Sequence, residues 1–318
     1  MLDVMLPAFE FAKHLRLTFG MLSPPSVRGH YDYDYFDVSR FMNDFQHKPF
    51  VNVESLALDI PLARSSAQRR LEIANFPHLK LLDLTGLFNY KGLRVKLPKS
   101  LISFRYCGRL TWTDLQNISE NASFTEFVWL GCELEESDVL KLSDNTNVVD
   151  LVAQPEFQAC RLPSVKDFHI GYSKLQFYYG CPFYEHHNCW ILLALMPNLR
   201  KLRIERPPEG SQTRDTFVSV LSYTPLISTL IFDATPWTVK FIHQLIRTLP
   251  RLREVYTDRK KSTNIDKLKN PFKSRTVTFH TQPLQREKPP PKSISLPDMD
   301  WFKNRPERLK RRKYRGRE

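Results

Sequence analysis

The residues best suited to bind a metal lie in segment 181–189, which reads CPFYEHHNC. The segment offers two thiols and two imidazoles, the ligand types that zinc prefers. They are Cys181, His186, His187 and Cys189. A structural zinc site usually takes a close pair of ligands from each of two arms, and a single short loop places four ligands poorly. We therefore expect no metal and no cofactor, and keep these four residues as weak candidates.

Catalytic motifs are absent from the sequence. It contains no Gly-x-Ser-x-Gly turn, no phosphate-binding glycine loop and no His-Glu-x-x-His helix, and only 10 of its 318 residues are glycine. The five cysteines are an odd number without paired spacing, which suits buried thiols in a reducing compartment. They are Cys107, Cys132, Cys160, Cys181 and Cys189. We therefore predict that the chain is not an enzyme.

The elements that must position any functional residue are short strands of one recurring pattern. Segments 77–84 (PHLKLLDL), 197–204 (PNLRKLRI) and 250–257 (PRLREVYT) each alternate apolar and polar residues after a turn. Three apolar positions recur in each unit: Val53/Leu56/Leu58, Leu79/Leu82/Leu84, Leu101/Phe104/Tyr106, Phe124/Phe127/Trp129, Val148/Leu151/Ala153, Val165/Phe168/Ile170, Leu199/Leu202/Ile204, Ile227/Leu230/Phe232 and Leu252/Val255/Thr257. Spacings of roughly 20 to 30 residues predict an α/β leucine-rich-repeat solenoid with irregular repeats and a curved parallel sheet.

Helix start signals stand between several of these strands. Thr113 and Ser137 precede apolar turns, and Thr238 precedes an apolar stripe at helical spacing. The stripe consists of Val239, Ile242, Leu245, Ile246 and Leu249. Each unit is therefore expected to run strand, turn, helix, turn.

The repeats are expected to fill residues 1–282, with a first strand at 12–17, an insertion loop at 20–50 and a last strand at 276–280. Residues 283–318 are expected to form a disordered linker containing prolines, followed by a basic tail. Residues 259–318 hold 19 Lys and Arg against 6 Asp and Glu, which accounts for the whole formal charge of +13. The 28 basic and 28 acidic residues left in the body cancel, which argues against a basic solenoid face that tracks a phosphate backbone.

The end of the tail carries a dense set of cations: Arg308, Lys310, Arg311, Arg312, Lys313, Arg315 and Arg317. Such a run can be a nuclear import signal, an arm that binds nucleic acid, or a solvated charge run. The sequence has no apolar run of 18 residues and no signal peptide, so we expect a location in the nucleus, the cytoplasm or both, and no membrane partner.

The surface left for recognition is the row of side chains between the last two inward positions of each strand, which lines the concave face of a solenoid. Besides Ala57, the predicted partner-binding row comprises Asp83, Arg105, Val128, Val152, His169, Arg203, Ile231 and Tyr256. Arginine and exposed apolar side chains are typical of protein interfaces, although the same residues can also be merely solvated strand positions.

The pattern Leu-Pro-x-Leu-x-x-Leu-x-Leu, as in residues 162–170, resembles the divergent leucine-rich repeats of F-box proteins from lower eukaryotes. No complete F-box is visible, since only a Leu6-Pro7 pair precedes the first expected strand. The resemblance implies a protein-recognition module, an adaptor or substrate-recognition subunit of a ubiquitin ligase with Skp1 and cullin subunits as partners. The alternative is a nuclear factor that contacts nucleic acid or ribonucleoprotein through its basic tail.

Overall fold

The computed structural model describes residues 11–18, 50–59, 70–73, 76–85, 94–108, 110–130, 134–135, 148–171, 187–205, 211–232, 238–257 and 277–280. All of them belong to one compact unit, residues 1–284. The predicted insertion loop, apart from Phe50, and the predicted basic tail lie outside the described residues, so the expectations for them stay predictions. No helix in the described ranges is long and apolar enough to span a bilayer.

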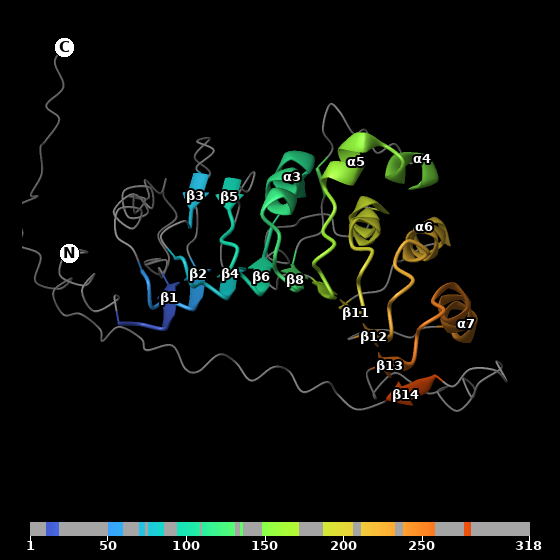
Figure 1. Cartoon of the computed structure of the whole chain (residues 1–318). Coiled ribbons are helices and arrows are strands. Elements are labelled where there is room, and N and C mark those ends of the chain that lie inside the picture. The colour runs from blue at the N-terminus through green and yellow to red at the C-terminus, as the bar shows by residue number, and fades with distance from the viewer. Residues whose placement is uncertain are drawn as a thin grey trace, which may run out of the picture. The chain divides into compact units, whose positions relative to one another are not determined.

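The main element is a sheet of ten parallel strands whose order in space follows their order in the chain (Figure 1). The strands are β1 (His14–Thr18), β2 (Ser55–Asp59), β4 (Leu81–Leu84), β6 (Ser103–Tyr106), β8 (Glu126–Trp129), β10 (Asp167–Ile170), β11 (Lys201–Ile204), β12 (Thr229–Phe232), β13 (Glu254–Thr257) and β14 (Thr278–His280). Because each strand pairs with the strand of the next unit, the predicted α/β repeat fold is confirmed.

One face of this sheet is buried because alternate residues of every strand are apolar. The register aligns Leu82 with Phe104, Phe104 with Phe127, and Phe127 with Phe168. Phe104 and Phe127 stack with ring centroids 5.6 Å apart, and Phe168 lies 5.4 Å beyond Phe127. All three rings are at most 2% exposed. Each such ring contributes about 1.5–3 kcal/mol by its burial, which ties three units into one core.

Helices cover the buried face of the sheet, and Figure 1 shows all of them on the same side. They are α3 (Trp112–Glu120), α4 (Val148–Val152), α5 (Pro155–Ala159), α6 (Ser211–Leu221), α7 (Val239–Thr248) and the 3-10 helix η2 (His187–Leu195). In the units that start at β2 and β4, the described residues between the main strands include the short strands β3 (Arg70–Glu72) and β5 (Arg94–Lys96), which pair with each other. In the same way β7 (Leu110–Thr111) pairs with β9 (Leu134–Glu135).

The turns before the strands are joined by hydrogen bonds from one unit to the preceding one. In four units the residue before the first inward position donates its side chain to a carbonyl of the previous unit. We call this set the turn ladder: Ser100 to Leu79 (2.9 Å), Ser123 to Lys99 (2.7 Å), Ser164 to Ala122 (3.3 Å) and Asn198 to Pro163 (2.9 Å). Each bond satisfies a carbonyl that the parallel ladder leaves without a partner strand.

A tight turn after β6 depends on Gly108, whose φ of 147° is rarely adopted by residues with a side chain. A Cβ atom there would lie 2.8 Å from the hydroxyl of Tyr106. The turn directs the Gly108 carbonyl at the buried indole of Trp129, whose Nε1 donates to it at 2.9 Å. A glycine is therefore needed for this buried indole to find a partner.

Two expectations about local structure are wrong. The segment expected to be a strand at Val148, Leu151 and Ala153 forms helix α4. Short apolar runs do not separate strand from helix, and here Leu151 and Val152 are buried side by side while Val149 is 58% exposed. Helix α3 is capped by Thr111, not Thr113: Thr111 Oγ1 accepts the N–H of Asp114, whose carboxylate accepts the N–H of Thr111. Thr238 caps α7 as predicted.

Candidate interaction surface

The sheet face opposite the helices, which we call the open face, presents the predicted row. Strand register places the following residues side by side across the ten strands, and we call them the central row: Arg16, Ala57, Asp83, Arg105, Val128, His169, Arg203, Ile231, Tyr256 and His280. Every predicted partner-binding residue except Val152 is in this row. Arg16 and His280 extend it at the two ends and were missed, although both occupy the same position in the strand pattern.

Val152 is not on the open face. It belongs to α4, on the side of the sheet that the helices cover, and its side chain is only 8% exposed. The wrong strand assignment explains this error, because the residue was placed by counting positions in a strand that does not exist. The interval from β8 to β10 therefore contributes no row residue of its own.

Two of the predicted apolar anchors, Val128 and Ile231, do lie in the central row but are buried, contrary to the expectation that they are exposed. Val128 is 8% exposed and Ile231 is 3% exposed. Val128 is aligned with Arg105 and His169, and Ile231 with Arg203 and Tyr256. Since adjacent strands are about 4.8 Å apart, longer neighbours restrict the access of solvent to a short side chain between them. A partner on the open face would therefore meet mainly the long polar and aromatic side chains.

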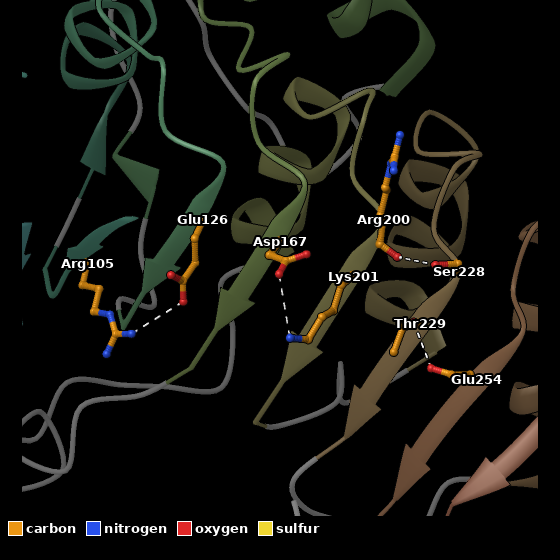
Figure 2. Close-up of polar contacts among 8 residues, drawn as sticks. All are labelled: Arg105, Glu126, Asp167, Arg200, Lys201, Ser228, Thr229 and Glu254. Carbon is orange, nitrogen blue, oxygen red and sulfur yellow. Dashed lines mark hydrogen bonds and ion pairs between the residues drawn. The ribbon is translucent and has the colours of Figure 1, made fainter. Parts of the chain in front are cut away.

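A second row on the open face lies two residues earlier in each strand, and we call it the first row: His14, Ser55, Leu81, Ser103, Glu126, Asp167, Lys201, Thr229, Glu254 and Thr278. It carries charges that sequence reasoning did not single out. Arg105 Nη2 lies 3.6 Å from Glu126 Oε1, and Lys201 Nζ lies 3.8 Å from Asp167 Oδ2 (Figure 2). The period-2 alternation of the strands was the signal that could have found them.

Asp167 occupies an unfavourable position for a charge in the first row. Desolvation by burial raises the pKa of its carboxyl above the ordinary value, and the charge of Glu126 on β8 raises it further. Lys201 acts in the opposite direction. The two carboxylates in register, Glu126 and Asp167, therefore lie between two cations, Arg105 on β6 and Lys201 on β11. The charges follow the order positive, negative, negative, positive over four strands.

Beside them, His169 and Glu205 form a third polar contact on the open face. His169 Nε2 lies 3.1 Å from Glu205 Oε1, and their side chains are 20% and 31% exposed. The carboxylate packs over Gly171, where an added Cβ atom would lie 2.7 Å from each carboxylate oxygen. The absence of a side chain at Gly171 thus leaves room for Glu205 next to the imidazole.

The C-terminal end of the central row is aromatic. The rings of Tyr256 and His280 stack with centroids 4.3 Å apart and an interplanar angle of 12°. The Tyr256 hydroxyl lies 3.4 Å from a carboxylate oxygen of Glu254. Desolvation by burial raises the pKa of the phenol, and the negative charge of this carboxylate raises it further. A flat aromatic pair beside a carboxylate offers stacking and hydrogen bonding to a partner.

The weak metal candidates are only partly within the described structure. Cys181 and His186 lie outside it, and His187 begins η2. Cys189, Cys107 and Cys160 are 6%, 2% and 3% exposed, so the predicted burial of the cysteines is confirmed for these three. No group of three or more His, Cys, Asp or Glu residues suited to a metal occurs in the described ranges.

Comparison with known proteins shows a likeness of fold to a leucine-rich-repeat protein. No protein-family model matches the chain, and no curated protein matches it. The solved structure of the leucine-rich repeat-containing protein LegL7 from Legionella pneumophila is similar over 78% of this chain and 82% of that chain, with 16% sequence identity and a TM-score of 0.36. The fold of this chain is established by its own strand order and register.

Proposed function

We propose that this chain is a non-enzymatic protein-recognition module that holds a protein partner on its open face. The observation that carries the proposal is the central row, in which one register aligns arginine, histidine and tyrosine side chains across ten parallel strands. Arginine and tyrosine are enriched where proteins bind one another, because they combine contact area with directed hydrogen bonds.

The test is capture of partners by the full chain and by an open-face variant. In the variant, Arg203→Glu and Tyr256→Ala remove a cation and an aromatic ring from the central row. The control is Lys240→Glu with Thr113→Ala, two exposed residues on helices on the opposite side of the sheet. Proteins retained by the parent and the control but lost from the open-face variant support the proposal. An unchanged set of partners in all three would overturn it.

The finer proposal is that the module is an adaptor or substrate-recognition subunit of a ubiquitin ligase. It is supported by the resemblance of the 162–170 pattern to the repeats of F-box proteins. Purified Skp1 and cullin subunits should then bind the full chain, and this binding should survive the open-face substitutions because the target and the ligase occupy different surfaces. No binding of either subunit at micromolar concentrations would remove the ligase role and leave the recognition module intact.

A second candidate function is supported by the charge distribution. The whole excess of +13 lies in residues 259–318, which favours contact with nucleic acid through the tail, in the nucleus. About 8 phosphate contacts would give a slope near −7 in a plot of log K against log salt for duplex DNA. Replacing the seven tail cations from Arg308 to Arg317 by glutamine should flatten this slope. A slope near zero in the parent chain would eliminate the candidate.

A further inference from the structure

A third row of residues runs along the edge of the sheet where the strands begin. We call it the edge row: Lys13, Glu54, Lys80, Ile102, Thr125, Lys166, Arg200, Ser228 and Arg253. The backbone N–H of every member after Lys13 donates a hydrogen bond to the carbonyl of the member before it, at 2.7–2.9 Å. These hydrogen bonds therefore form one continuous chain from β1 to β13. The spacing of these side chains is therefore fixed by the sheet itself.

The edge row is basic although the repeat body as a whole is neutral. Its exposed charged members are Lys13, Lys80, Lys166, Arg200 and Arg253, against the single carboxylate of Glu54. Glu54 is paired with Lys80 at 2.8 Å. None of Lys166, Arg200 and Arg253 has an ion-pair partner among the described residues. The C-terminal half of the row thus carries three uncompensated cations over four neighbouring strands.

Figure 2 shows that the Arg200 side chain extends away from the Asp167–Lys201 pair of the first row, while its carbonyl accepts the Ser228 hydroxyl at 3.3 Å. The compensated charges of the open face and the uncompensated charges of the edge row are therefore separate features. The two surfaces share no residue, so the edge row can bind whether or not the open face does.

An exposed apolar residue stands between the cations of the edge row. Ile102 is 52% exposed, and it lies one strand from Lys80 and two strands from Lys166. The row contains no aromatic residue on which a base could stack, which is the usual means of holding single-stranded nucleic acid. Cations around an aliphatic side chain instead complement an acidic protein segment with an apolar residue in it.

We propose that the edge row binds an extended acidic segment of a partner protein, with an apolar side chain of that segment seated against Ile102. Six strand spacings of about 4.8 Å separate Lys80 from Arg253, or about 29 Å. An extended chain rises about 3.3 Å per residue, so a segment of about 9 residues spans the row from Lys80 to Arg253. Its carboxylates face Lys166, Arg200 and Arg253. Because these charges are exposed, binding weakens as salt is added.

The test uses a fluorescein-labelled peptide of about 10 residues, made of Asp and Glu around a central leucine, and measures its binding by fluorescence anisotropy. The protein is the full chain with glutamine in place of the seven tail cations, which removes the densest basic run of the tail as a competing site, and all variants are compared in this same background. The edge variant is Lys166→Glu with Arg200→Glu. The matched control is Lys240→Glu with Arg247→Glu, which makes the same change of charge on the exposed side of α7.

The edge variant should raise the Kd by at least about tenfold, and the control by less than about twofold. Ile102→Ser should weaken the peptide with leucine but not a peptide with serine in that place. Milder glutamine variants at Lys166 and Arg200 give the same comparison if the charge reversal disturbs folding. Equal losses in the edge and control variants, no binding by the parent at low salt, or tighter binding of oligothymidylate through the same two residues would each overturn the proposal.

Discussion

Nε2 of His169 lies 3.1 Å from Oε1 of Glu205, and the room for this contact comes from Gly171, one residue after β10. His169 is a central-row residue, whereas Glu205 follows the end of β11. The contact therefore fixes the orientation of a predicted recognition residue from the neighbouring strand. A backbone position without a side chain is what allows it.

We expect a double-mutant cycle with His169→Ala and Glu205→Ala to give a coupling of about 0.5–1 kcal/mol in urea unfolding, since both side chains are partly buried. Gly171→Ala should abolish this coupling, because the new methyl group displaces the flexible carboxylate. In the Glu205→Ala background the same glycine change should cost little. A coupling that persists in Gly171→Ala would contradict the assignment.

Asp167 should titrate above the ordinary range for aspartate, as measured by NMR of its carboxyl carbon. Lys201→Met should raise this pKa further and Glu126→Gln should lower it, because the two neighbours act in opposite directions. Opposite signs for the two variants are the decisive result. Shifts in the same direction would mean that a global change, not these two charges, controls the carboxyl.

The same shift predicts how stability depends on pH. A carboxyl whose pKa is raised in the folded state stabilises the fold below the unfolded pKa, and this contribution is lost as pH rises through the folded pKa. The free energy of unfolding of the parent relative to Asp167→Asn should therefore fall as the pH rises through the ordinary aspartate pKa of about 3.9 and then through the raised pKa of the folded state. A difference that grows with pH would show the opposite shift.

Substitutions of Thr111 and Thr113, at the start of α3, should differ in their effect on stability. Thr111→Ala should cost about 1 kcal/mol of unfolding free energy, because it removes the side chain that caps the helix and leaves the buried Asp114 with fewer partners. Thr113→Ala should be nearly neutral, since Thr113 is exposed and lies within the helix. Urea unfolding of the two variants checks this order, and the reverse order would restore Thr113 as the cap.

The turn ladder should contribute measurably to the cohesion of the units. Ser123→Ala and Asn198→Ala should each cost about 1 kcal/mol, because each leaves a carbonyl of the previous unit without its donor. Ser222→Ala is the control, since its hydroxyl bonds to Ser219 only three residues away. Equal costs for all three variants would show that the ladder adds nothing beyond a local hydrogen bond.

Cys160 should resist alkylation in the folded protein. Its thiol is 3% exposed, and burial raises its pKa to about 11, so at pH 8 almost none of it is thiolate. Labelling with iodoacetamide, followed by mass spectrometry of the Cys160 peptide, should proceed only through unfolding and accelerate with urea. Rapid labelling without denaturant would contradict the burial of this residue.

The sequence by itself determined most of the strands, because the same three apolar positions recur from unit to unit and alternate with polar residues along each strand. It also determined which residues share the central row, since a period of two decides which side of a strand each residue occupies. It failed at 148–153, where a short apolar run fits a helix and a strand equally well. The helical conformation of that segment, α4, depends on its packing in the tertiary structure.

Only the tertiary structure decided how the charges and the apolar residues of the surface are distributed. The net charge of residues 1–258 is zero, which hid a basic edge row beside paired charges in the first row, because a sum carries no information about position. The burial of Val128 and Ile231 depends on long side chains from other units that lie more than 20 residues away in the chain. The packing of the Glu205 carboxylate over Gly171 likewise brings together residues of two units, and no local sequence pattern predicts it.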